Sequence, residues 1–351
     1  MSYIQKPIAH HPALPKNKIG LTRRDYEASM STLCAGCGHD SITAAIIEAC
    51  YHLDLPAHRI AKVSGIGCSS KAPTYFLGRS HGFNSVHGRM PSVATGANLA
   101  NRDLTYIGVS GDGDTASIGL GQFCHAVRRQ LNMTYIVMNN GCYGLTKGQF
   151  SATNDKDSPS KKGEQNPFEA IDLCQMAIQL GAGFVARSFS GDKAQLVPLI
   201  EAALTYNGFA FIDVLSPCVT FNNHTTSTKS YEYIRDHYQM LGRLDFVPEM
   251  DEITVEYEQG ASVDVTLHDG GLLRLHKLDS SHDVRSSDEA IMAIRKQSAD
   301  GAVATGLLYI DDSERDLHDV IGTSAQPLNA IGMDQLCPGS KALEGINARL
   351  R

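Results

Sequence analysis

Apolar residues along this chain follow two patterns that alternate with each other. Short apolar runs bounded by turn residues predict strands at 60–64, 105–109, 134–138, 184–187 and 209–215. Apolar residues at helical spacing predict helices over 40–53, from the turn after 109 to about 131, over 168–180 and over 192–206. Strands that alternate with helices indicate an α/β fold, a doubly wound and mostly parallel sheet with helices on both faces.

Polar and charged stretches mark the boundaries of this region. The first 30 residues are polar and contain several prolines, which predicts an extended arm, and 151–165 predicts a polar loop. After about Lys229 charged residues become denser; 263–276 predicts a hairpin that turns at 269–271, 286–297 a helix and 302–310 a strand. We therefore expect an arm (1–30), an α/β domain (31–229) and an α+β C-terminal extension (230–351) that contacts another subunit.

Composition excludes several classes of protein. The chain has 351 residues, a net charge of −7 and only short runs of Lys and Arg, which argues against nucleic acid as a partner. No apolar run reaches the length of a membrane span, and the N-terminus lacks the layout of a signal peptide. Nine cysteines without such a signal favour a reducing compartment, so we expect a cytoplasmic protein with no membrane partner.

Two turns after neighbouring predicted strands carry the most informative residues. The run 105–109 leads into Ser110-Gly-Asp-Gly-Asp114, and 134–138 ends on Asn139-Asn140. Ligands bind at the carboxyl ends of strands in open α/β sheets, where Gly111 and Gly113 would let a phosphate approach the backbone. Asp112 and Asn140 would add oxygen ligands for a phosphate-bound Mg²⁺. The combination resembles the diphosphate–Mg²⁺ motif of thiamine diphosphate enzymes; the alternative is a pair of plain turns.

Four cysteines fall in loops that the predicted fold places near one edge of the sheet: Cys34, Cys37, Cys68 and Cys218. Irregularly spaced thiolates suit a [4Fe–4S] cluster, and a redox dithiol or half of a zinc site are the alternatives. The other cysteines differ in setting. Cys142 lies two residues after Asn140, so its backbone carbonyl could complete the Mg²⁺ shell, while three lie in helical patterns and one in the tail: Cys50, Cys124, Cys174 and Cys337.

Taken together, these motifs resemble the β subunit of 2-oxoacid:ferredoxin oxidoreductases over at least residues 30–230. The matching stretches are Leu33-Cys-Ala-Gly-Cys-Gly-His39, Gly65-Ile-Gly-Cys-Ser69, His87-Gly-Arg89, Gly111-Asp-Gly-Asp114, Tyr143-Gly-Leu-Thr-Lys-Gly-Gln149 and Ser216-Pro-Cys-Val-Thr-Phe221. The resemblance implies that the four loop cysteines hold a [4Fe–4S] cluster and that Asp112, Asn140 and the Cys142 carbonyl hold Mg²⁺. It also implies which residues line thiamine diphosphate: Ile66, Gly67, Cys68, Ser69, His87, Gly88, Arg89, Gly111, Gly113, Asp114, Gly144 and Leu145.

The same resemblance implies a reaction and partners. A partner α subunit would supply the pyrimidine-binding domain and the activating carboxylate, so that this chain alone is inactive. The reaction would be decarboxylation of a 2-oxoacid to its coenzyme A thioester, with electrons passed through the cluster to ferredoxin, or the reverse carboxylation.

Lys71 is the main candidate for substrate choice, since a lysine at this position looks like the partner of the second carboxylate of 2-oxoglutarate. A solvated surface lysine is the alternative. Lys147 could approach substrate or coenzyme A, or pair with an acidic residue. Pyruvate or several 2-oxoacids are the nearest alternative substrates. A non-catalytic thiamine diphosphate- or zinc-binding regulator and a redox-inactive decarboxylase are alternatives of other classes.

Overall fold

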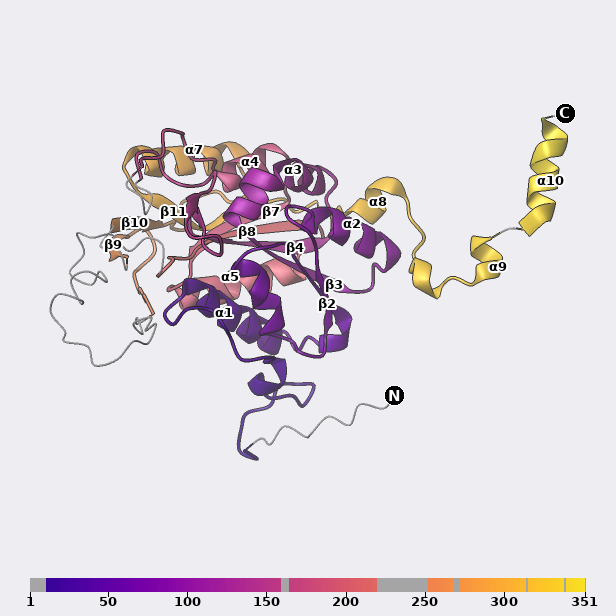
Figure 1. Ribbon diagram of the computed structural model, residues 1–351, viewed down its shortest axis with the longest axis horizontal. Helices are drawn as coiled ribbons and strands as arrows, with labels where there is room; N and C mark the ends of the chain where they lie inside the picture. The colour runs from indigo at the N-terminus through magenta and orange to yellow at the C-terminus, as the bar shows by residue number, and fades with distance from the viewer. Residues whose placement is uncertain are drawn as a thin grey trace.

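The computed structural model describes residues 11–158, 164–219, 252–267, 272–313, 315–337 and 339–350. Across these ranges a nine-stranded sheet runs through the molecule with helices on both faces (Figure 1). This confirms the predicted α/β fold class. Parts of several sequence-based expectations lie outside the described residues: the first ten residues of the arm, 159–163 of the polar loop, the last two residues of the motif 216–221, the boundary at Lys229 and the hairpin turn at 269–271.

The strands follow the order β2-β1-β3-β4-β8-β7-β11-β10-β9. Their bounds are β1 (Ile60–Ser64), β2 (His81–Asn84), β3 (Thr105–Gly111), β4 (Met133–Asn139), β7 (Phe184–Phe189), β8 (Phe209–Leu215), β9 (Ser262–Thr266), β10 (Leu272–Lys277) and β11 (Val303–Ile310). From β2 to β7 every neighbouring pair is parallel. The chain goes from β1 to β2 on one side and then to β3 on the other, which places a topological switch point between β1 and β3.

Two groups of helices cover the sheet. One face carries α1 (Gly38–His52) and α5 (Lys193–Thr205); the other carries α2 (Met90–Ala100), α3 (Leu120–Arg128), α4 (Leu173–Gln179) and α7 (Ser287–Ala299) (Figure 1). Successive residues of β4 serve the two cores, because Ile136 packs with the α1 face and Tyr135 with the α3 face. Burial on both faces explains why the central strands read as continuous apolar runs.

The sequence did not predict every element or boundary. It gave no signal for β2 or α2, and the helix expected from 168 begins at Leu173, where the Asp172 side chain accepts a hydrogen bond from the Gln175 amide at 2.9 Å. The single helix expected after the Gly-Asp-Gly turn is a π-helical turn, η4 (Gly113–Ile118), followed by α3.

Strands of the C-terminal extension join the main sheet. The predicted hairpin is antiparallel β9–β10, and β10 runs parallel to β11, which pairs antiparallel with β7. A mixed edge of this kind is common on otherwise parallel sheets. The extension therefore lengthens the sheet on the side away from β1.

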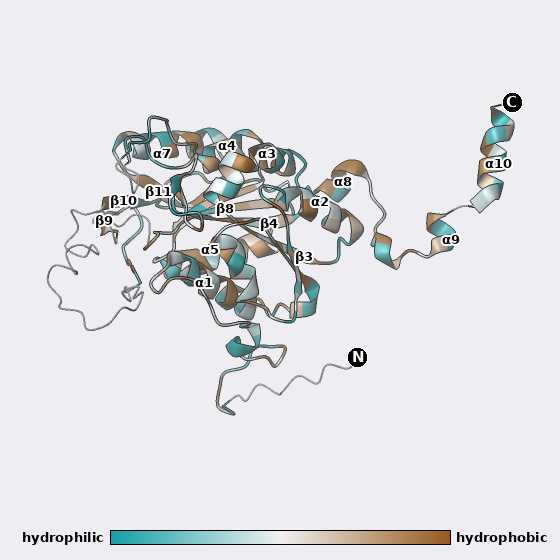
Figure 2. Cartoon of the chain, in the orientation of Figure 1, coloured by the Kyte–Doolittle hydropathy of each residue, from teal (hydrophilic) through white to brown (hydrophobic). Residues whose placement is uncertain are grey.

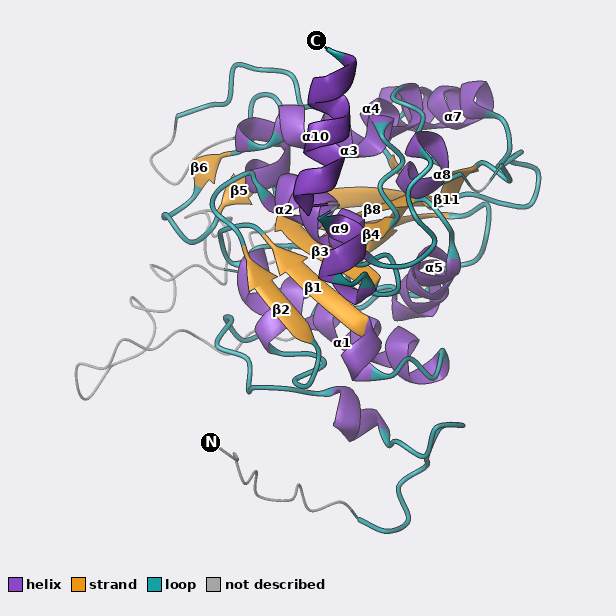
Figure 3. Ribbon diagram, turned by 90° about the vertical axis from the view of Figure 1, so that its right-hand side faces the viewer, coloured by secondary structure: helices purple, strands orange, loops and turns teal. Residues whose placement is uncertain are grey.

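Short elements complete the fold. These are η1 (Arg23–Tyr26), η2 (Ala57–Arg59), η3 (Ser69–Thr74), β5 (Cys142–Tyr143), β6 (Gln149–Phe150), α8 (Leu317–Ile321), η5 (Leu328–Ala330), α9 (Met333–Leu336) and α10 (Gly339–Arg349). Figure 3 shows β5 and β6 beyond the arrowheads of β1, β2 and β3. This small hairpin thus lies at the edge of the sheet where the parallel strands end.

The two ends of the chain behave differently. Tyr26 of the arm is buried and packs edge-on against Tyr51 of α1, so this part of the arm covers its own chain. By contrast, α9 and α10 extend away from the sheet with apolar and polar residues mixed along them (Figure 2). Within the ranges given above, no helix combines the length and the apolar character needed to cross a bilayer.

Candidate functional site

The turns that follow β1, β3 and β4 meet at one small cavity. Since these strands are neighbours and parallel, their carboxyl ends lie at the same edge, next to the switch point. The cavity has a volume of about 120 Å³. Most of the residues predicted to hold cofactor or Mg²⁺ line it: Ile66, Gly67, Cys68, Ser69, His87, Gly111, Asp112, Gly113, Asp114, Asn140, Cys142, Gly144 and Leu145.

Asp112 lies at the centre of this edge and is almost completely buried. Its carboxylate accepts hydrogen bonds from the Ser151 and Thr153 hydroxyls, the latter at 2.8 Å. It also accepts one from the backbone N–H of Asn140 at 3.3 Å. Burial raises its pKa, while these donors lower it. Among the described residues no basic side chain pairs with Asp112. A buried carboxylate held only by neutral donors fits a site for a cation.

The two adjacent asparagines at the end of β4 face different partners. The Asn140 side-chain oxygen accepts a hydrogen bond from the Cys142 amide at 3.1 Å and lines the cavity. Asn139 donates to Asp213 at 3.0 Å and lies behind the cavity. Asn140, with a second lone pair on its amide oxygen, is therefore the asparagine that could hold a metal ion beside Asp112.

Asp114 has a different role from Asp112 although only one residue separates them. One of its oxygens accepts from the Gly88 amide at 2.8 Å and the other from the Ser110 hydroxyl at 2.9 Å. Gly88 has φ +67°, and its backbone packs closely against that of Gly119. A Cβ on Gly88 would lie only 2.7 Å from the Gly119 nitrogen. Asp114 thus fixes the turn containing His87 and Arg89 against the end of η4.

The four predicted cluster cysteines lie beside this cavity. Cys37 is the N-cap of α1, and a Cβ on Gly144 would lie 3.4 Å from Cys68 Sγ and 3.9 Å from Cys218 Sγ. Burial raises the pKa of Cys37 to about 12, with further increases from Cys218 and Cys34. Burial, Cys218 and Cys34 also raise the pKa of Cys68, which Lys71 lowers. Cys34 and Cys218 therefore lie within electrostatic reach of both Cys37 and Cys68.

Cysteine thiolates are the ligands of both zinc sites and iron–sulfur clusters. In the described part of the chain, no three His, Cys, Asp or Glu side chains are grouped around a point that could hold one metal ion. Burial disfavours the thiolate form of Cys37 and Cys68 and so raises their pKa values. A bound metal would stabilise the thiolate form, because thiolates are its ligands.

A fifth sulfur lies next to the cluster cysteines. A hydrogen bond between the Cys142 and Cys218 thiols raises the pKa of Cys142, and burial raises it further. The sequence suggested a role only for the Cys142 backbone carbonyl. Of the remaining cysteines, Cys50 and Cys174 are buried as expected, Cys124 is half-buried in α3 and Cys337 is exposed.

The predicted substrate lysines do not line the cavity. Lys71 is half-buried in η3, and its amide donates to the Cys68 carbonyl at 3.2 Å, which keeps it close to the cluster cysteines. Lys147 is exposed, with φ +83° in the turn between β5 and β6. Arg89 is exposed and does not line the cavity either.

Sequence reasoning missed several residues of the site. Buried His39 lines the cavity, its Nδ1 lies 2.6 Å from the Ser216 hydroxyl, and burial lowers its pKa to about 4, so the ring is neutral. Tyr143 also lines it and donates to the Gly113 carbonyl at 3.0 Å. His39 and Tyr143 stand in the matching motifs, whereas Ser151 and Thr153 lie in a polar stretch that carried no signal.

A larger opening of about 730 Å³ lies elsewhere, between the arm and the β2 edge. Its buried lysine, Lys62, already donates to the carbonyls of Pro73 and Phe76 at 2.6 Å and of Leu77 at 3.1 Å. None of the residues predicted to hold cofactor or metal lines this opening. The chemistry therefore points to the smaller cavity.

Comparison with known proteins agrees with this placement. Residues 65–214 match the family model described as "Thiamine pyrophosphate enzyme, C-terminal TPP binding domain". Thiamine pyrophosphate and thiamine diphosphate are the same compound. The chain is 38% identical over 227 residues, 64% of its length, to a 2-oxoacid:ferredoxin oxidoreductase subunit beta from a Sulfolobus species, of which it covers 72%. It is 39% identical over 194 residues, 54% of its length, to the Mycobacterium tuberculosis 2-oxoglutarate oxidoreductase subunit KorB, of which it covers 51%.

A solved structure is similar over almost the whole chain. It is the 2-oxoglutarate:ferredoxin oxidoreductase from Magnetococcus marinus, determined with 2-oxoglutarate, coenzyme A and succinyl-CoA bound. The TM-score is 0.68 at 27% sequence identity, and the match covers 93% of this chain and 97% of the other.

The setting of Asp112 predicts opposite effects on stability and on binding. Asp112→Asn removes a buried charge, so we expect the cofactor-free protein to gain about 1 kcal/mol in its free energy of unfolding. The same change removes an anionic metal ligand, so added Mg²⁺ and thiamine diphosphate should no longer raise the melting temperature as they do in the wild type. Thermal unfolding with and without both ligands tests this. A variant that keeps the full ligand-induced rise would contradict the assignment.

The placement of the thiols predicts which cysteines hold iron. Cys34→Ser should cost most of the bound iron and the visible absorbance of anaerobically purified protein, since an alcohol is a poor ligand for this metal. Cys34 is exposed, so folding should not depend on it. Cys337→Ser, also exposed but in the tail, is the control and should keep both signals. Equal iron contents in the two variants would remove Cys34 from the ligand set.

Proposed function

The chain belongs to the family of 2-oxoacid:ferredoxin oxidoreductase β subunits, and from that premise we propose that it is the β subunit of a 2-oxoglutarate:ferredoxin oxidoreductase. The observation that supports this most is that the Asp112–Asn140 pair and the thiols of Cys68 and Cys218 lie at one edge of the sheet. The decarboxylating and electron-accepting groups would then be neighbours. In this proposal, residues 31–229 hold both cofactors and 230–351 contribute subunit contacts.

The residues at the cavity fit thiamine diphosphate and Mg²⁺. Bound together at this edge, thiamine diphosphate would supply the carbanion chemistry that decarboxylates a 2-oxoacid, and the [4Fe–4S] cluster would accept electrons singly. Asp112, Asn140 and the Cys142 carbonyl would hold the Mg²⁺ on the diphosphate. Glycine at 113 lets the Tyr143 ring pack against this turn, because a Cβ on Gly113 would lie 2.5 Å from the ring, and Tyr143 itself lines the cavity.

The size of the cavity supports an incomplete site that a second subunit completes. Its volume of about 120 Å³ is well below the roughly 300–1,000 Å³ typical of sites for organic ligands. Two of its apolar lining residues, Ile118 and Leu145, remain 45% and 53% exposed. An α subunit placed over this mouth would cover that apolar surface and exclude water from the reacting atoms. It would also supply the carboxylate that activates the cofactor.

The substrate assignment rests on Lys71 and on the relatives. The Mycobacterium relative and the Magnetococcus structure carry 2-oxoglutarate in their names. Lys71 lies three residues after Cys68, the N-cap of η3, and is only half-buried, so its ammonium group could reach a carboxylate in front of the cluster. Coenzyme A would take the acyl group, and ferredoxin would take the electrons from the cluster.

The proposed function predicts the activity of the assembled enzyme. The chain co-purified anaerobically with its α subunit should reduce ferredoxin or a viologen with 2-oxoglutarate and coenzyme A, and should contain bound iron. The isolated chain is the control and should be inactive, because the activating carboxylate is missing. Turnover by the isolated chain would contradict the subunit assignment. Activity mainly with pyruvate would keep the reaction class and overturn the substrate.

The position of Lys71 predicts a selective defect. Lys71→Ala should raise KM for 2-oxoglutarate roughly tenfold to a hundredfold, since a charge-assisted hydrogen bond contributes about 1.5–3 kcal/mol. KM for pyruvate, which lacks the second carboxylate, should change little. Steady-state kinetics with both substrates measures this difference.

Lys147→Ala is the matched control, because it removes the same charge from the neighbouring turn. Equal KM increases for the two substrates in the Lys71 variant would argue against a carboxylate contact. A selective increase in the Lys147 variant would transfer the role to that residue.

A further inference from the structure

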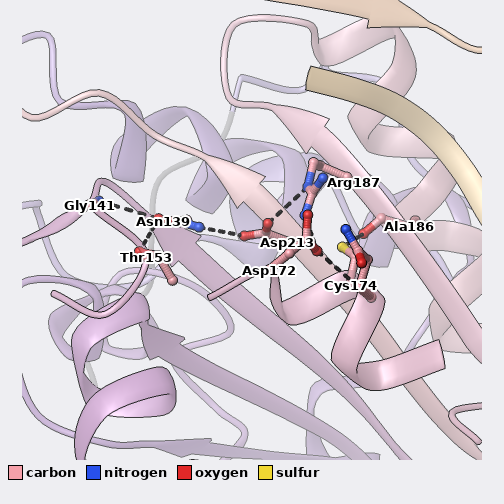
Figure 4. Close-up of polar contacts among 9 residues, drawn as sticks. Asn139, Gly141, Thr153, Asp172, Cys174, Ala186, Arg187 and Asp213 are labelled. Carbon is pink, nitrogen blue, oxygen red and sulfur yellow. Dashed lines mark hydrogen bonds and ion pairs between the residues drawn. The ribbon is translucent and has the colours of Figure 1, made fainter. Parts of the chain in front are cut away.

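An arginine that the proposed chemistry does not use lies buried behind the cavity. Arg187 of β7 donates from Nε to Asp213 of β8 at 3.0 Å and from Nη2 to Asp172 at 2.8 Å (Figure 4). Arg187 and Asp213 are direct partners in the β7–β8 register, and both side chains are nearly inaccessible to solvent. Burying charges is costly, so such a group is often kept for what it positions rather than for stability.

The hydrogen bonds continue from this ion pair towards the cavity. The second oxygen of Asp213 accepts from the Asn139 side-chain amide at 3.0 Å. The Asn139 side-chain oxygen accepts from the Gly141 amide at 3.3 Å and lies 3.0 Å from the Thr153 hydroxyl (Figure 4). Asn139 is therefore held at both ends of its side chain, and it closes the turn that contains Asn140.

Thr153 connects the turn to Asp112. Its hydroxyl lies 2.8 Å from Asp112 Oδ2 as well as 3.0 Å from the Asn139 oxygen, and its one proton can serve one of these acceptors at a time. A continuous set of contacts thus runs from Arg187 through Asp213, Asn139 and Thr153 to Asp112. Gly141 has φ +71°, which favours glycine and allows the tight turn that follows Asn140.

We propose that Arg187 and Asp213 are positioning residues that fix the Asn139–Gly141 turn and so preset Asn140 and Asp112 for Mg²⁺. Arg187 orients the Asp213 carboxylate, and that carboxylate fixes which end of the Asn139 amide faces the turn. The inference rests on the proposed function, because it assumes that Asn140 and Asp112 bind Mg²⁺. Partners behind metal ligands commonly affect metal affinity by about tenfold to a hundredfold.

Two substitutions separate positioning from bulk stability, because each removes one carboxylate charge from the same arginine. In Asp213→Asn, the new amide cannot accept from both Arg187 and Asn139, since one of its two ends is a donor. In Asp172→Asn, a single amide oxygen can keep both bonds that Asp172 Oδ1 now accepts, from Arg187 and from the Gln175 amide. Asp172→Asn is therefore the matched control.

The measurement is the Mg²⁺ concentration that gives half-maximal thiamine diphosphate binding to the cofactor-stripped complex of the full chain with its α subunit. Asp213→Asn should raise this concentration about tenfold or more, and excess Mg²⁺ should restore full occupancy. Asp172→Asn should stay close to the wild type. Asn139→Ala breaks the same path beyond the intact ion pair and should behave like Asp213→Asn. Melting temperatures of all variants identify any that fail to fold.

Three outcomes would overturn the inference. If the Asp213 and Asp172 variants had equal Mg²⁺ requirements while the wild type bound normally, the ion pair would only connect β7 with β8 and would not position the metal ligands. Lost occupancy that excess Mg²⁺ does not restore would indicate a general folding defect. A wild-type complex that binds thiamine diphosphate without any Mg²⁺ dependence would overturn the proposed function as well, so the two failures are distinguishable.

Discussion

Parallel pairing of β1, β3, β4 and β8 is the constraint on which the site depends. Parallel strands end at the same edge, so four turns that are far apart in the sequence become neighbours there. The turns after β1 and β8 bring Cys68 and Cys218 to that edge, while those after β3 and β4 bring Asp112 and Asn140. Reversing any one of these strands would carry its turn to the opposite edge.

Two features of this edge are unfavourable in the protein alone and would become favourable with ligands. Asp112 is a buried carboxylate without a basic partner in the described part of the chain, and the clustered thiols have raised pKa values. A divalent cation would compensate the first, and iron would take the second as thiolates. Because the two groups share one edge, both cofactors would form a continuous route for electrons away from the substrate.

The inner and outer sides of the cavity differ in structure. On the inner side, hydroxyls, amides and a buried ion pair hold the turns in place from behind. On the outer side, the lining residues Ile118 and Leu145 remain partly exposed. A site whose turns are hydrogen-bonded within one chain and whose mouth keeps exposed apolar residues suits an enzyme that is completed by another subunit.

The sequence by itself determined the central strands and most of the helices between them, because strands buried on both faces are continuously apolar and helices buried on one face show helical spacing. It also determined the candidate ligands, since Gly111, Asp112, Asn140 and the cysteines are set by local turn and ligand chemistry. Contacts between distant segments were decided only by the tertiary structure. Nothing local to Ser151 or Thr153 indicates that both would reach Asp112, or that Asn139 would face Asp213.

The structure also decided what each similar residue does. Asp112 and Asp114 have the same chemistry and nearly the same position in the chain, yet Asp114 is satisfied by Gly88 and Ser110 while Asp112 has no basic partner among the described residues. Likewise β2 and β11 carry no signal for where they join the sheet, because strand pairing depends on contacts with other segments and not on the strand's own residues. Local patterns fix what a segment can form, and only its neighbours in space fix what it faces.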